Sequence, residues 1–522
     1  MQLAASRIGS EEGSPIPCFE TGSRSAGMLL HITSLPSRFG IGDLGPEAIR
    51  FVAGLSEAHQ RYWQVLPLHP ADKSHQYSPY HATSLFAFNP LLISPEIMVS
   101  DGKADQSQLM GLLSKDRSGS GFLEEAHLKM DFLRTTAQQN RCGRGDPGFD
   151  HFWWANRCWL DDYALFSAIS GSRGTTTWSD WPDPLRDREP DTIEEERRKL
   201  ATSIEEEQYI QYLAFSQWDA LHAFARNHCV SIIGDLPLYP AYESADVWSH
   251  KELFRLDEGG RPLAVAGVPP DYFSTTGQWW GNPVYRWEEM ESQGFSWWVQ
   301  RVGHLLSMVD CIRIDHFRGL SACWEIPASA GTAGEGHWVP VPGYALLSCL
   351  AARFPSLPFV AEDLGTITPD VRNLMTAFGI PGMRVLQFGF NRDPNNPHAP
   401  EAIREDVVLY TGTHDNNTVR GWFEEEASLE ERERITSILG KLPETGTISH
   451  DLIDCAFHTE APVAIIPVQD LLGLGSGARM NRPATTEGNW QWRLQPGEPR
   501  AEDWAWLREL TIRAGRHSPA AK

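Results

Sequence analysis

The chain has 522 residues, of which 41% are hydrophobic and 22% are charged, and its formal net charge is −23. This composition is that of a globular protein, and the negative charge argues against nucleic acid or an anionic membrane as a partner. No apolar leader and no run of about 18 apolar residues is present, which predicts a cytoplasmic protein without membrane spans.

The two ends of the chain are expected to lie outside the folded part. Residues 1–24 are polar and rich in Gly and Ser, which predicts a flexible leader. Residues 517–522 are expected to be a loose tail. A single folded domain over residues 25–516 lies between them.

Eight short apolar runs, rich in β-branched and aromatic residues, recur along this domain. They cover residues 27–32, 62–68, 230–236, 311–315, 358–362, 383–390, 407–413 and 463–468. Runs of this length that are apolar almost throughout are typical of parallel strands buried on both faces. Helical patterns lie between several of them, at 46–59 with Glu47 in the first turn and at 368–378 with Thr368 as the N-cap. Eight parallel strands that alternate with helices predict an α/β fold, the (β/α)8 TIM barrel.

The uneven spacing of the runs predicts two large insertions. The first, at roughly 91–226, contains helical patterns at 152–167 and 193–215 and is expected to be mostly helical. The second, at roughly 239–298, is expected to be loop-like and aromatic. Both follow the C-terminal ends of strands, the barrel face on which catalytic loops grow.

Four of the eight runs end in an acidic residue or are followed by one. Asp235 closes the third, Asp315 the fourth and Glu362 the fifth, and Asp415 follows the seventh. In a barrel these strand ends converge on one mouth, where like charges are costly unless something uses or compensates them. Arg313 lies on the same face of its strand as Asp315 and can keep that carboxylate ionised. Two carboxyl groups held in different protonation states are typical of glycoside chemistry.

Other motifs are weak. The GxGxxG match at 143–148 has no strand before it, and four residues separate the GxGxxA match at 473–478 from the eighth run, whereas a phosphate site needs the glycines at the strand–helix turn. No HExxH motif, EF-hand loop or Cys/His metal spacing occurs. We therefore expect neither a metal nor an organic cofactor.

The sequence resembles the 4-alpha-glucanotransferases of glycoside hydrolase family 77 over most of its length. The likeness is carried by LLHITSLPSRFGIGDLG (29–45), GVPPDYFSTTGQWWGNPVYRW (267–287), RIDHFRG (313–319), AEDLG (361–365), TGTHDN (411–416) and RMN…TTEGNWQWR (479–493). The resemblance implies a barrel with inserted subdomains and without a C-terminal β-sandwich domain, and the stretch after the eighth run is too short for such a domain.

The resemblance also implies roles for individual residues. Asp315 would be the nucleophile, Glu362 the general acid/base and Asp415 the stabiliser of the transition state. The remaining implied residues bind the sugars: Arg313, His414 and Asp235 around the donor ring, Ser78, Tyr80 and Asn481 on the donor side, and Tyr272, Phe273, Gln278 and Trp280 as a wall toward the acceptor. The expected substrates are maltooligosaccharides and amylose-type α-1,4-glucans, with glucose as an acceptor.

Two alternatives use the same residues differently. An α-glucan hydrolase would pass the donor to water instead of to a sugar. A non-catalytic glucan-binding protein would use the 20 tryptophans as sugar platforms, but intact carboxyl residues at three strand ends argue against it.

Overall fold

The computed structural model describes residues 23–71, 75–114, 122–270, 276–485 and 487–517. The predicted leader and tail therefore lie almost entirely outside the described residues. Within these ranges no helix is both long and apolar enough to cross a membrane.

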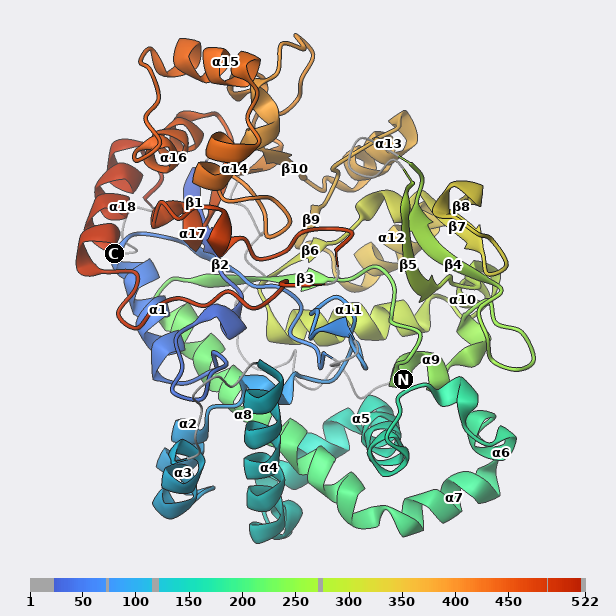
Figure 1. Ribbon diagram of the computed structural model, residues 1–522. Helices are drawn as coiled ribbons and strands as arrows, with labels where there is room; N and C mark the ends of the chain where they lie inside the picture. Colours follow the sequence, from blue (N-terminus) through green and yellow to red (C-terminus); the bar gives the residue numbers. More distant parts are fainter. Residues whose placement is uncertain (1–22, 72–74, 115–121, 271–275, 486, 518–522) are drawn as a thin grey trace.

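A parallel eight-stranded barrel forms the centre of the molecule (Figure 1). Its strands, in chain order, are β1 (Ser25–Leu29), β2 (Tyr62–Gln64), β3 (Ser231–Leu236), β6 (Cys311–Ile314), β9 (Phe359–Ala361), β10 (Gly382–Val385), β11 (Val407–Tyr410) and β12 (Val463–Pro467). Parallel pairing runs from β10 through β11, β12, β1, β2, β3 and β6 to β9. The two end strands meet where the Ala361 N–H donates to the Pro381 carbonyl at 2.8 Å. All eight predicted strands and the (β/α)8 barrel are confirmed.

Alternation along the strands separates the two sides of the barrel wall. One set of strand residues packs inside the barrel, with members such as Leu29, Ile233, Val360 and Tyr410. Their direct neighbours, such as Ile232, pack outside against the helices. Successive side chains of a strand point to opposite faces, so this parity fixes which later residues enter the barrel mouth.

Helices surround the barrel and fill the insertions. Their bounds are α1 (Pro46–Glu57), α2 (Pro95–Ser100), α3 (Gln106–Leu113), α4 (Phe122–Gln139), α5 (Pro147–Arg173), α6 (Asp183–Arg186), α7 (Pro190–Lys199), α8 (Ala201–Asn227), α9 (Ala245–Ser249), α10 (Trp287–Ser292), α11 (Ser296–Met308), α12 (Gly343–Arg353), α13 (Pro369–Phe378), α14 (Val419–Glu425), α15 (Leu429–Leu439), α16 (Ile448–His458), α17 (Val468–Leu471) and α18 (Ala501–Arg513). The helix predicted at 46–59 is α1, which ends at Glu57. The helix predicted at 368–378 is α13, with Thr368 at its N-cap and Gly379 in the left-handed conformation at its C-cap.

The first insertion contains α2 to α8, which lie together on one side of the barrel in Figure 1. The single helix predicted at 193–215 is wrong, because the chain leaves helical geometry at Leu200 (φ −105°, ψ 16°) between α7 and α8. Three basic residues, Arg197, Arg198 and Lys199, occupy the last turn of α7, where they favour a helix C-terminus. The long helices α5 and α8 pack against each other through aromatic side chains such as Trp159 and Phe215.

The second insertion is not loop-like, which corrects the prediction. It supplies β4 (Ala264–Val268) and β5 (Gln278–Pro283) to an antiparallel sheet of order β5-β4-β7-β8, whose other strands are β7 (Ala322–Pro327) and β8 (His337–Pro340). Because β7 and β8 follow the fourth barrel strand in sequence, no local pattern links them to β4. After β12 the described residues contain helices and turns but no strand.

Candidate active site

Strand parity brings the predicted acidic residues to the inside of the barrel mouth. Asp235 lies two residues after the inward-facing Ile233, and Glu362 lies two after Val360. Asp315 likewise lies at the inward parity, four residues after Cys311 on its strand. The side chains therefore enter one space from three neighbouring strands, β3, β6 and β9, which pair in that order.

Arg313 joins two of these carboxylates. Its Nη1 lies 2.8 and 2.7 Å from the two oxygens of Asp235, and its Nη2 lies 3.0 Å from Oδ1 of Asp315. Burial would lower the pKa of Arg313, yet the two carboxylates raise it above its usual value. Asp235 is fully buried, whereas 30% of the Asp315 side chain is exposed. The more open carboxylate of the pair is thus the one that a ligand in the mouth can approach.

Glu362 is held next to Asp315 by the backbone. Its Oε2 accepts the N–H of His316, and its Oε1 accepts the N–H of Leu364, both at 2.8 Å. Burial raises the pKa of Glu362 to about 7, with Arg313 opposing this and Asp315 adding to it. A carboxyl group with this pKa can both donate and accept a proton near neutral pH.

His316 is a site residue for which the sequence predicts no role. Its backbone is left-handed (φ 49°, ψ 53°), which is uncommon outside glycine and turns its N–H toward Glu362. Burial lowers the pKa of its imidazole to about 4, so the ring is neutral at pH 7. The ring meets Trp280 edge to face at 4.8 Å between centroids. No sequence signal indicates a positive φ at a histidine.

Asp415 reaches the mouth on the loop after β11. Asn481 donates to its Oδ1 at 2.6 Å, and Nε2 of His414 lies 3.4 Å from the same oxygen. Nearly half of the Asp415 side chain is exposed, whereas His414 is buried. The structure therefore joins three predicted residues, His414, Asp415 and Asn481, in one cluster.

Tyr80 links this cluster to the carboxylates of the neighbouring strands. Its hydroxyl donates to Oδ2 of Asp235 at 2.6 Å, and its ring stacks on His414 at 5.2 Å with an angle of 13°. Trp490, which the sequence does not single out, contacts both rings at 5.8 and 6.0 Å and is buried. Ser78 lies in the adjoining turn, where its carbonyl accepts the His81 N–H.

The acceptor-side residues are only partly described. Gln278 and Trp280 lie on β5, and the Trp280 indole N–H donates to Oε1 of Gln278 at 3.2 Å. The contact of Trp280 with His316 brings this strand to the mouth. Tyr272 and Phe273 lie outside the described residues.

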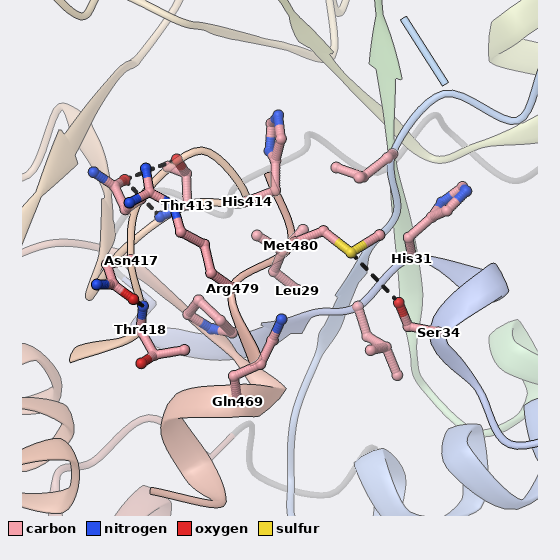
Figure 2. Close-up of a pocket in the computed structure, with 14 residues that line it drawn as sticks. Leu29, His31, Ser34, Thr413, His414, Asn417, Thr418, Gln469, Arg479 and Met480 are labelled. Atoms are coloured by element: carbon pink, nitrogen blue, oxygen red, sulfur yellow. Dashed lines mark hydrogen bonds between the residues drawn. The ribbon is translucent and has the colours of Figure 1, made fainter. Parts of the chain in front are cut away.

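A small cavity of about 20 Å³ lies behind His414, between the loop after β11 and the ends of β1 and β12. Figure 2 shows Met480 lying between His414 and Ser34, whose hydroxyl contacts the Met480 sulfur at 3.7 Å, and Arg479 lying beside Thr413 and Asn417. Such a volume is that of a single water molecule. This cavity is therefore too small for a sugar.

The arrangement is suited to acid–base and nucleophilic chemistry on a polar substrate. It offers an exposed carboxylate bound to arginine, a second carboxyl group with a pKa near 7, and a third held by an amide and an imidazole. In the described part of the chain, no three His, Cys, Asp or Glu side chains are placed to hold a metal ion.

Comparison with known proteins gives consistent matches over most of the chain. A family model described as 4-alpha-glucanotransferase matches residues 30–499. A 4-alpha-glucanotransferase of Aquifex aeolicus is 44% identical over 472 residues, which are 90% of this chain and 96% of that protein. One of Thermus thermophilus is 44% identical over 501 residues, or 93% and 98% of the two chains. The structure of an amylomaltase from Streptococcus agalactiae in complex with acarbose matches with a TM-score of 0.91 at 34% identity, covering 95% of this chain and 100% of that one.

Proposed function

Because the chain belongs to the 4-alpha-glucanotransferase family, glycoside hydrolase family 77, we propose that Asp315, Glu362 and Asp415 transfer a glucan segment by retaining double displacement. The chain is a glucanotransferase that acts on glucan. The observation that carries the residue roles is the pair Asp315 and Glu362, one bound to Arg313 and the other with its pKa raised to about 7.

In the first step Glu362 gives its proton to the glycosidic oxygen while Asp315 attacks the anomeric carbon. The bond between that carbon and the oxygen breaks, and the leaving glucan departs with a free 4-hydroxyl. The donor remains as an ester of Asp315. Arg313 supports this step because its Nη2, 3.0 Å from Oδ1 of Asp315, holds the attacking carboxylate in place.

Asp415 and its neighbours act on the donor ring during both steps. Positive charge develops at the ring oxygen and anomeric carbon in the oxocarbenium-like transition state, and a fixed carboxylate stabilises it. Asn481 and His414 hold Asp415 in place, and Tyr80 and Asp235 form the adjoining wall. Ser78 is proposed to contact the donor beyond this wall.

In the second step an acceptor hydroxyl replaces the leaving glucan. Glu362, now ionised, accepts the proton of the 4-hydroxyl while that oxygen attacks the anomeric carbon and the ester to Asp315 breaks. Gln278 and Trp280 stand on the strand that contacts His316, and with Tyr272 and Phe273 we assign them to acceptor binding. A bound sugar can outcompete water because orientation supplies effective molarities of about 10⁵ M or more.

The finer identity of the substrates belongs to this proposal. We assign maltooligosaccharides and amylose-type α-1,4-glucans as donors and glucose or another glucan as acceptor. Residues 91–226 and 239–298 are proposed as subdomains inserted into the barrel domain of 25–516. A cytoplasmic location stays a prediction from the sequence.

Incubation with maltotriose tests transfer against hydrolysis. We expect oligomers longer than maltotriose together with glucose, measured by chromatography of the products. Maltose and glucose as the only products would instead identify an α-glucan hydrolase.

The nucleophile is tested by Asp315→Asn. We expect turnover to fall by several orders of magnitude, about 10⁴-fold or more, because the amide cannot form the ester. Binding of maltooligosaccharide, measured by calorimetry, should largely persist. Asp191→Asn, an exposed aspartate on α7, is the matched control and should keep full turnover. Near-normal activity of Asp315→Asn would refute the assignment.

A further inference from the structure

Arg479 lies between the loop that carries Asp415 and the segment that carries Asn481. It follows the short 3₁₀ turn Ser476–Ala478 and is mostly buried, with 16% of its side chain exposed. Figure 2 shows its guanidinium directed toward the loop of residues 413–418. The sequence assigns no role to it.

All three guanidinium nitrogens of Arg479 have protein partners. Nη2 donates to the Asp415 carbonyl at 2.7 Å, and Nε donates to the Asn481 carbonyl at 2.8 Å. Nη1 lies 3.3 Å from Oε1 of Glu426. These contacts direct the side chain into the protein. Each guanidinium nitrogen already has a protein partner, so none is set aside for a sugar hydroxyl.

The two carbonyls that Arg479 binds belong to the two residues joined at the reaction centre. Asn481 donates through its amide to the Asp415 carboxylate at 2.6 Å, and its backbone N–H donates to the His414 carbonyl at 3.0 Å. Arg479 therefore closes the main chains of Asp415 and Asn481 around the contact between their side chains. Movement of either backbone would change the place of the carboxylate.

Glu426, which contacts Nη1 of Arg479, is itself held by further hydrogen bonds. The same Oε1 that faces Arg479 accepts the side-chain N–H of Asn417 at 2.8 Å, and Asn417 also donates to the Ser476 hydroxyl at 3.0 Å. The network thus connects the loop after β11, the C-terminal end of α14 and the turn before Arg479. Burial lowers the pKa of Arg479, whereas the nearby charge of Glu426 raises it. The guanidinium therefore remains charged at neutral pH.

We propose that Arg479 is a positioning residue of the transfer reaction, which holds the Asp415 carboxylate in its reactive place through the backbones of Asp415 and Asn481 without touching the glucan. The inference rests on the role of Asp415 in the proposed function. Arginine is suited to this because its planar fork binds several oxygens at fixed angles, whereas a lysine presents one nitrogen.

The test is a double-mutant cycle with maltotriose, with kcat and KM measured for Arg479→Met, Asp415→Asn and the double variant. A misplaced carboxylate should lower kcat of Arg479→Met by about 10²-fold. KM should change by less than about threefold, because the lost interaction acts in the transition state. In the Asp415→Asn background the same substitution should cause no further loss, since the carboxylate it positions is gone.

Two further variants separate positioning from folding and from charge. Arg479→Lys should recover part of kcat, and it carries the same cycle if Arg479→Met does not fold by circular dichroism. Arg482→Met removes an exposed arginine three residues away on the same segment and should leave kcat and KM unchanged.

The possible failures are distinguishable. Losses that multiply in the double variant, a raised KM with unchanged kcat, or an equal loss in Arg482→Met would each overturn the role of Arg479. Near-normal turnover of Asp415→Asn alone would overturn the role of Asp415 in the proposed function, and the inference with it.

Discussion

Glu362 meets opposing influences that together place its pKa where a catalytic acid needs it. Burial and the charge of Asp315 raise the pKa, while Arg313 and the Leu364 N–H lower it, and the balance is a value of about 7. The two backbone N–H groups also fix the direction of the carboxyl group. Removing Arg313 would therefore change two carboxyl groups at once.

This value predicts the pH dependence of the first half-reaction. Glu362 must carry its proton in order to protonate the leaving oxygen. The value of kcat/KM for maltotriose should therefore fall tenfold per pH unit above about pH 7. A maltosyl fluoride needs no such proton, and with this donor the alkaline fall should disappear. If the alkaline fall has the same midpoint with both donors, a group other than Glu362 causes it.

His316 and Trp490 show how backbone conformation contributes at the residue scale. Both have positive φ, 49° and 64°, which non-glycine residues seldom adopt. In one case the result is an N–H directed at Glu362, and in the other an indole placed against Tyr80 and His414. The surrounding contacts must stabilise these conformations, because the residues alone do not favour them.

At the scale of elements, Arg516 fastens the last helix to the barrel. Its guanidinium donates to the carbonyls of Phe457 at 2.7 Å, Ala461 at 2.9 Å and Ser25 at 3.0 Å. It thereby ties α16 to the starts of β1 and β12. The side chain is fully buried, and burial lowers its pKa to about 9.

Arg516→Ala is expected to destabilise the fold without changing the chemistry. Several buried carbonyls would lose their donor, at a cost of about 3 kcal/mol in the free energy of unfolding. Arg516 lies at the N-terminal ends of the strands, on the side of the barrel opposite the carboxylates. The value of kcat/KM at 25 °C should therefore remain unchanged. Denaturant unfolding of Arg513→Ala, an exposed neighbour paired with Asp454, provides the control. A loss of activity without a loss of stability would contradict this assignment.

The two insertions contribute differently to the site. The small antiparallel sheet brings Trp280 to His316 through β5. The helical insertion reaches the site less directly, through Phe122 of α4, whose ring lies 5.1 Å from the Arg493 guanidinium. Arg493 in turn donates to the Trp490 carbonyl at 3.0 Å, so α4 supports the residue that packs on Tyr80.

For the whole molecule, buried histidines predict a loss of stability in acid. Burial lowers the pKa of His31 and His69 to about 3 and of His304 and His398 to about 4, whereas an unfolded histidine titrates near 6.5. These groups take up protons on unfolding below about pH 6.5. Their stabilisation is therefore complete above that pH and is lost as the pH falls toward 4, at up to about 1.4 kcal/mol per histidine per pH unit.

Thermal unfolding between pH 7.5 and 5 checks this. We expect the midpoint to fall with pH, although Asp470, whose pKa burial raises to about 6, opposes the trend. His398→Asn keeps an acceptor for the Val385 N–H and removes one titrating group, so its midpoint should fall less steeply. An identical pH dependence of both proteins would contradict the role of the histidines.

The amino-acid sequence by itself determined the barrel and the three carboxyl positions. Apolar strand runs and strand parity are local properties, and Asp235, Asp315 and Glu362 each lie at the C-terminal end of a run, at the parity that faces inward. The family that the resemblance at these motifs predicted is also the family whose model matches the chain. Such features are readable because each depends on residues adjacent in the chain.

Only the tertiary structure decided the features that depend on distant partners. The sequence predicted one helix where the chain breaks at Leu200 and a loop-like insertion where β4 pairs with β7, and it assigned no roles to Arg479, Trp490 and His316. A sheet formed from separate segments leaves no periodic signal in either one. Arg479 binds backbone carbonyls, which every residue carries. The identity of the residues that it contacts therefore does not predict these hydrogen bonds. The physical reason is common to both: these contacts are fixed by where the folded backbone brings segments together, and not by local propensity.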